Sequence, residues 1–180
     1  MKIYFLRHGK TQLNKEKRTS GHLDVPLLSE GREEARKVFK LEQEKFDIIY
    51  SSDLIRCQET SEIINEKLKL QIIYDIRLRE RDFGTLAGKL IDELGSELME
   101  REKNQQYDYR PFGGESVEDV RVRVLTCIRS IIGNNKNKRV LVVTHGGVIR
   151  LLHNLVNSEV KENIINGFLY EFDFPDYNKN

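Results

Sequence analysis

The chain of 180 residues is 38% hydrophobic and 33% charged, which is typical of an ordinary folded globular domain. Its formal net charge is only +1, so no basic field indicates binding to nucleic acid or to an anionic membrane surface. Cys57 and Cys127 have neither metal-ligand nor redox spacing, and we expect both to be small core residues in a reducing compartment.

The first predicted element is a buried strand at Ile3–Leu6, a short apolar run that Gly9 brings to an end. Arg7 and His8 follow it at the strand's carboxyl end, where open α/β sheets bind their ligands. A guanidinium offers fixed donors to phosphate and an imidazole can be a nucleophile. Alone, the pair also fits two polar residues in water at the end of a strand.

Helices and strands then alternate along the chain. A loop at 21–28 precedes a helix capped by Ser29, and a strand at Asp47–Tyr50 precedes a helix capped near Asp53. Arg56 lies in the first turn of that helix, where the helix N-terminus itself favours an anion. We therefore expect Arg56 to face the carboxyl ends of the strands.

The middle of the chain has a weaker pattern. A strand at 70–74 leads into a densely charged segment at 76–84, and a helical stretch at 89–107 is divided by Gly95. A loop at 110–115 follows, and Ser116 with Asp119 forms a capping box that opens a long helix.

The last part of the chain predicts a strand at 139–143, a helix at 148–156, a final strand at 167–174 and a frayed tail at 175–180. His145 stands between the first of these strands and its helix. The alternation predicts a three-layer α/β/α sandwich with a mainly parallel central sheet, in one domain over 1–180. Such a sheet would bring His8, Arg56 and His145 to one edge, which indicates a site.

Six motifs, spread in order over nearly the whole chain, resemble those of the histidine phosphatase superfamily, also called the phosphoglycerate mutase-like family. They are Arg7-His8-Gly9-x-Thr11-x-x-Asn14, Gly21-His22-x-Asp24-x-Pro26-Leu27, Ser51-Ser52-Asp53-Leu54-x-Arg56, Leu78-x-Glu80-x-x-Phe83-Gly84, Gly114-Glu115-Ser116 and Thr144-His145-Gly146-Gly147.

The resemblance implies phosphoryl transfer without a metal or another cofactor. His8 would attack phosphorus and form a phosphohistidine, with Arg7, Arg56 and His145 around the transferring oxygens. His8 must be neutral, so an acceptor should hold its other ring nitrogen.

The resemblance also implies that Glu80 protonates the leaving alcohol and later deprotonates water. Phosphate beside Glu80 should raise its pKa by like-charge repulsion. Asp82 and Glu93 compete for this role because the segment is crowded with charge. Asn14 and the Gly21 backbone would line the rim of the pocket.

The chain departs from the family at Leu13, where many members carry an aromatic residue, and at 85–88, which lacks the usual aromatic and acidic residues. Both places border the substrate pocket in the family. The identity of the substrate therefore stays open.

Three functions fit the resemblance. The first is a phosphatase of small phosphomonoesters, and the second a phosphoglycerate mutase that depends on 2,3-bisphosphoglycerate. The third is a catalytically weak relative that binds a phosphorylated ligand. The short stretch between Glu80 and Thr144 offers only Arg101, Lys103 and Arg110 as clamps for a carboxylate, which favours the phosphatase.

The expected partner is a small phosphorylated metabolite, with no nucleic acid and no membrane, and with either a monomer or a homodimer as the assembly. The residues before Arg7 are too few for a signal peptide, so we expect the cytoplasm. The four histidines have no metal-ligand spacing, and no metal site is expected.

Overall fold

A five-stranded sheet with strand order β3-β2-β4-β1-β5 forms the centre of the molecule. The structure is a computed structural model that describes residues 1–38, 45–161 and 163–174. Four strands are parallel and the edge strand β5 is antiparallel to β1, which confirms the predicted mainly parallel sheet. Their bounds are β1 Lys2–Arg7, β2 Ile48–Ser51, β3 Ile72–Tyr74, β4 Val140–Thr144 and β5 Leu169–Asp173.

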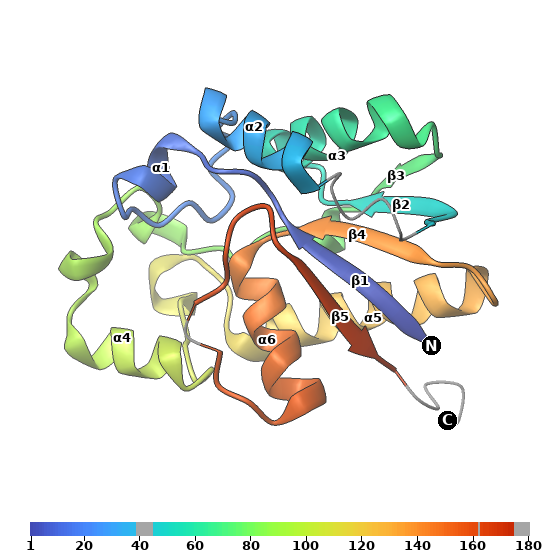
Figure 1. The fold of residues 1–180 in the computed structure, drawn as a ribbon. Helices are drawn as coiled ribbons and strands as arrows, with labels where there is room; N and C mark the ends of the chain where they lie inside the picture. The colour runs from blue at the N-terminus through green and yellow to red at the C-terminus, as the bar shows by residue number, and fades with distance from the viewer. Residues whose placement is uncertain (39–44, 162, 175–180) are drawn as a thin grey trace.

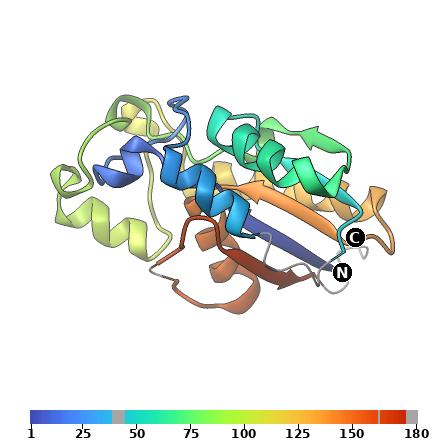
Figure 2. The ribbon, with the colours of Figure 1, turned by 45° about the horizontal axis from the view of Figure 1, so that its top comes forward.

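Helices cover both faces of the sheet, as the sequence predicts. Figures 1 and 2 show α2 (Ser29–Lys37) and α3 (Ile55–Leu68) on one face, and α5 (Val117–Asn134) and α6 (Gly146–Asn157) on the other. Side chains of a strand alternate between faces, so Tyr4 and Leu6 pack with Cys57 of α3. Ile3 and Phe5 enter the larger core that α5 and α6 cover. The three-layer sandwich is confirmed.

Two predicted helix caps are wrong by one residue. The N-caps of α2 and α3 are Leu28 and Leu54, not Ser29 and Asp53. The Asp53 carboxylate instead accepts a hydrogen bond from Arg79 Nε at 2.7 Å, so a tertiary ion pair has replaced the local cap. The short helix α1 (Gln12–Lys15) was not predicted, and a capping box of Thr11 and Asn14 opens it.

The connection between β3 and α5 contains short helical segments in place of one long helix. Gly95, with φ of +84°, separates the 3₁₀ turn at Ile91–Leu94 from α4, as predicted, and the capping box of Ser116 and Asp119 opens α5. In Figure 1, α1 and α4 lie at the end of the sheet away from the N-terminus. The segments are η2 Ile76–Leu78, η3 Gly84–Leu86, η4 Ile91–Leu94, α4 Ser96–Lys103 and η5 Arg110–Phe112.

Two remaining expectations concern the ends of elements and the membrane. The last strand is shorter than the predicted 167–174, and the tail at 175–180 lies outside the described residues. Over the part of the chain that the structure describes, every helix is too short or too polar to span a membrane.

Candidate active site

A cleft of about 420 Å³ lies where β1 ends, and it collects most of the predicted site residues. Five of the seven line it, whereas His145 and Gly21 do not. The N-terminus of α6 also contributes to the wall through Gly146 and Gly147. The five lining residues are Arg7, His8, Asn14, Arg56 and Glu80.

His8 is held in a form that suits a nucleophile. The side chain leaves the end of β1 with 3% of its surface exposed, and its Nδ1 lies 2.7 Å from the Gly9 carbonyl. Because a carbonyl only accepts, Nδ1 carries the ring proton and the lone pair is on Nε2. Burial, with the charges of Arg56 and Arg7, holds the pKa of His8 well below its usual value. His8 is therefore neutral at neutral pH, as the sequence predicts.

The loop after His8 depends on two glycines. A Cβ on Gly9 would collide with the Gly31 carbonyl, and a Cβ on Gly31 would collide with the backbone of Lys10. Only residues without a side chain allow the two backbones to approach so closely. The N-terminus of α2 thus packs directly on the loop that places His8.

Arg56 is fully buried in the first turn of α3, and the protein fixes its orientation. Its Nη1 donates to the Leu23 carbonyl and its Nη2 to the Gly21 carbonyl, both at 2.8 Å. Its Nε donates to His145 Nδ1 at 3.2 Å. A guanidinium has five N–H groups, so one on each Nη remains for a ligand. The Gly21 carbonyl turns toward Arg56, and the role of the Gly21 backbone at the rim stays a prediction.

His145 is fully buried beside Arg56 and is not among the residues that line the cleft. Its ring packs edge-on against His8 at 5.1 Å between ring centroids. Because Arg56 can only donate to Nδ1, the ring proton is on Nε2, which lies 2.9 Å from Ser52 Oγ. Burial and the Arg56 charge hold the pKa of His145 well below its usual value. In this arrangement both ring nitrogens have partners within the protein.

Arg7 and Asn14 complete the side of the cleft formed by β1 and α1. Arg7 Nη1 donates to the Ile164 carbonyl, and its buried Nε has no partner within the described structure. Burial lowers the pKa of Arg7 to about 10, so the guanidinium stays charged at neutral pH. Asn14 Oδ1 accepts from the Thr11 backbone N–H at 3.2 Å, which leaves its amide N–H groups as donors.

Glu80 lines the cleft, as Glu102 does, and 9% of the surface of Glu80 is exposed. Its two oxygens accept backbone N–H groups, from Arg81 at 2.9 Å and from Gly147 at 3.0 Å. Burial favours the neutral acid, but the Arg81 charge and these N–H donors outweigh it, and the pKa lies below its usual value. A Cβ on Gly147 would collide with the Glu80 carboxylate, so any other residue here would displace that carboxylate.

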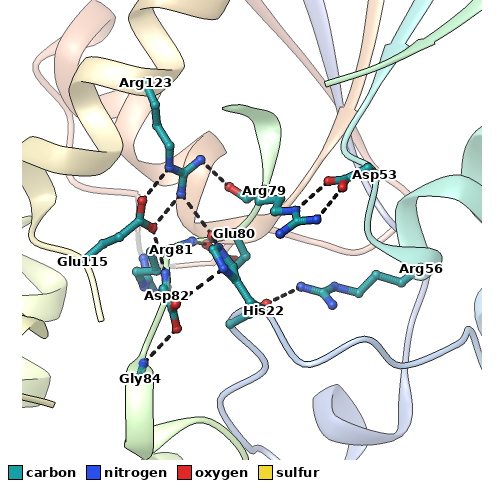
Figure 3. A network of polar contacts seen from close by, with 11 residues as sticks. His22, Asp53, Arg56, Arg79, Glu80, Arg81, Asp82, Gly84, Glu115 and Arg123 are labelled. Carbon is teal, nitrogen blue, oxygen red and sulfur yellow. Dashed lines mark hydrogen bonds and ion pairs between the residues drawn. The ribbon is translucent and has the colours of Figure 1, made fainter. Parts of the chain in front are cut away.

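The two competing acids lie elsewhere. Asp82 accepts from the Gly84 backbone N–H at 2.8 Å and contacts His22 at 3.4 Å (Figure 3), and neither Asp82 nor Glu93 lines the cleft. Of the expected carboxylate clamps, Lys103 lines the cleft and Arg101 and Arg110 do not.

Sequence reasoning missed several cationic residues of the cleft. Arg150 follows Gly146 by four residues and so lies on the same face of α6, which is a signal that could have revealed it. Buried Arg81 pairs with Glu102 at 2.8 Å, a contact with no local sequence signal. Lys161, after α6, also lines the cleft. The departures at Leu13 and at 85–88 do not line it.

Two curated proteins resemble this chain over most of its length. The chain is 37% identical over 98% of its length to phosphoglycerate mutase-like protein 4 of Arabidopsis thaliana, of which it covers 81%. It is 36% identical over 81% of its length to a probable phosphoglycerate mutase of Salmonella typhi, of which it covers 70%.

Two solved structures share the fold over nearly the whole chain. A mycobacterial glucosyl-3-phosphoglycerate phosphatase in complex with VO3 has a TM-score of 0.83 and 25% identity, over 94% of this chain and 91% of that one. A phosphoglycerate mutase from Thermus thermophilus has a TM-score of 0.81 and 28% identity, over 97% of this chain and 94% of that one. The family model of branch 1 matches residues 3–166, and the chain therefore belongs to the histidine phosphatase superfamily.

Proposed function

We propose that the protein is a metal-independent phosphatase of small phosphomonoesters that acts through a phosphohistidine on His8. The observation that carries the proposal is the hydrogen bond from Nδ1 to the Gly9 carbonyl, which leaves the lone pair on Nε2 of a cleft residue. Nε2 attacks phosphorus, an N–P bond forms and the bond to the ester oxygen breaks. Water then attacks the phosphohistidine, and phosphate leaves with neutral His8 restored.

Arg7 and Arg56 supply the positive charge that phosphoryl transfer needs. Arg56 is buried and Arg7 partly buried at the cleft, and phosphoryl transfer is catalysed mainly by positioning and preorganised charge. His145 supports this end of the cleft from behind, through its hydrogen bond with Arg56 and its contact with His8. A direct bond from His145 to phosphate requires its Nε2–H to turn away from Ser52.

Glu80 handles the protons in both steps. Without a ligand its lowered pKa makes it a carboxylate at neutral pH. A phosphate dianion that enters the cleft repels this charge and raises the pKa, so Glu80 takes up a proton. It gives this proton to the leaving oxygen and later accepts one from the attacking water.

The charge of the cleft favours substrates with a second anionic group. Seven arginine and lysine side chains and two glutamates line it, a net of five positive charges in a chain of net +1. A phosphate dianion balances only part of this charge. Burial and the charge of Arg81 both lower the pKa of Arg150, so an anionic group between these two guanidinium ions would relieve their repulsion.

The mutase alternative has the same chemistry and two relatives whose names say phosphoglycerate mutase. A panel of phosphomonoesters that includes monophosphoglycerates, assayed with and without 2,3-bisphosphoglycerate and with a chelator, separates the two. We expect phosphate release without the bisphosphate and with the chelator present. Isomerisation of monophosphoglycerate that depends on the bisphosphate, without phosphate release, would contradict the proposal.

Arg56→Ala is expected to lower the rate by about 10²-fold or more, as removal of an oxyanion donor does. Arg56→Lys should recover only part of the rate that Arg56→Ala loses, because a point charge does not replace the donors that the planar guanidinium of Arg56 presents. Steady-state kinetics test this, with thermal unfolding of each variant as the control for lost contacts to Leu23 and Gly21. Equal rates for arginine and lysine would place Arg56 outside the reaction.

A further inference from the structure

Arg123 of α5 uses all its donors within the protein, although it does not line the cleft. Its Nε and Nη2 donate to the two oxygens of Glu115 at 2.7 and 2.8 Å. Its Nη1 donates to the carbonyls of Arg77 and Arg79 at 2.9 and 2.7 Å, and Nη2 donates to the Glu80 carbonyl at 3.0 Å. These five bonds account for all five N–H groups of the guanidinium.

The three carbonyls belong to the segment that carries Glu80. This segment begins within η2, which contains Arg77, and it lies outside the sheet, so a side chain must supply donors that a neighbouring strand would have supplied. Figure 3 shows Arg123 above it and His22 on its other side. His22 Nε2 donates to the same Glu80 carbonyl at 2.8 Å.

Glu115 extends the same support past Glu80. Its Oε2 accepts from the Asp82 backbone N–H at 2.8 Å, and its own backbone N–H donates to the Asp82 carbonyl at 3.0 Å. The ion pair of Arg123 and Glu115 therefore holds the backbone on both sides of Glu80. Only about a fifth of each side chain of this pair is exposed, with 18% for Arg123 and 21% for Glu115.

We propose that Arg123, with Glu115 as its counter-ion, is a positioning residue that holds Glu80 where it can transfer a proton. The proposal rests on the proposed function, because it assigns Arg123 to the acid–base step of that reaction. A general acid must lie within hydrogen-bond reach of the oxygen that it protonates, and a small displacement costs much of the rate. Loss of Arg123 should therefore lower kcat and leave KM nearly unchanged.

Leaving-group dependence separates this role from a merely structural one. For Arg123→Met we expect kcat on an alkyl phosphate to fall by about 10- to 10²-fold. The rate of His8 phosphorylation by p-nitrophenyl phosphate should fall much less, because nitrophenolate leaves without a proton. Arg121→Met is the matched control, since Arg121 also lies on α5 and pairs with Glu118, and it should behave as wild type.

Arg123→Lys keeps the charge, so we expect the same dependence on the leaving group with a smaller loss of kcat. This variant replaces Arg123→Met in the test if Arg123→Met does not fold. In a Glu80→Gln background either substitution should cost little more, because both act on one step. Equal losses on both substrates, or losses that add to those of Glu80→Gln, would overturn the positioning role. A wild-type protein that hydrolyses neither substrate would instead contradict the proposed function itself.

Discussion

Glu80→Gln is expected to slow turnover of an alkyl phosphate by about 10²- to 10⁴-fold, the usual contribution of general acid catalysis. Glutamine can keep the bond from the Gly147 N–H through its carbonyl oxygen, but it has no acidic proton to give to the leaving alkoxide. An alkoxide is very basic, so it leaves slowly without protonation. The measurement is kcat for a primary alkyl phosphate.

The same variant should behave differently with p-nitrophenyl phosphate. Nitrophenolate leaves without a proton, so His8 should be phosphorylated almost as fast as in the wild type. The second step still needs Glu80 as base, and stopped-flow absorbance should show a burst of nitrophenolate and then slow turnover.

Asp82→Asn is the control for this experiment, because Asp82 is two residues away and does not line the cleft. It should show neither the burst nor the leaving-group dependence. The reverse pattern, with the burst in Asp82→Asn and not in Glu80→Gln, would move the acid from Glu80 to Asp82.

His8→Ala should abolish turnover of every substrate, including those with good leaving groups, because it removes the atom that attacks phosphorus. The measurement is phosphate release at high enzyme concentration. His153→Gln is the matched control on α6, outside the cleft, and should keep its activity. Full activity of folded His8→Ala, with folding checked by thermal unfolding, would rule out His8 as the nucleophile.

The residues that sequence reasoning placed correctly depend on local patterns. His8 follows an apolar strand and Arg56 opens an amphipathic helix, so the order of elements brings both to one edge of a parallel sheet. The helix break at Gly95 and the N-cap at Ser116 likewise follow from local sequence, and the structure confirms both. The family motifs then selected Glu80 within a segment that has no helix or strand period.

The remaining features depend on residues far apart in the sequence. The ring orientation of His145 is set by Arg56 and Ser52, about ninety positions away, and Arg123 reaches carbonyls more than forty positions before it. Asp53 looked like a helix cap and instead pairs with Arg79. Each of these polar groups has several possible partners in the sequence, and only the folded chain selects one.

Capture of the covalent intermediate tests the central claim most directly. Enzyme mixed with a radiolabelled phosphomonoester and denatured within the first turnover should carry label that survives base and is lost in acid, as phosphohistidine requires. Peptide mapping should place it on His8, and Glu80→Gln should accumulate more of it with p-nitrophenyl phosphate. Acid-stable label on a serine, or rapid hydrolysis with no label on the protein at any time, would contradict the account.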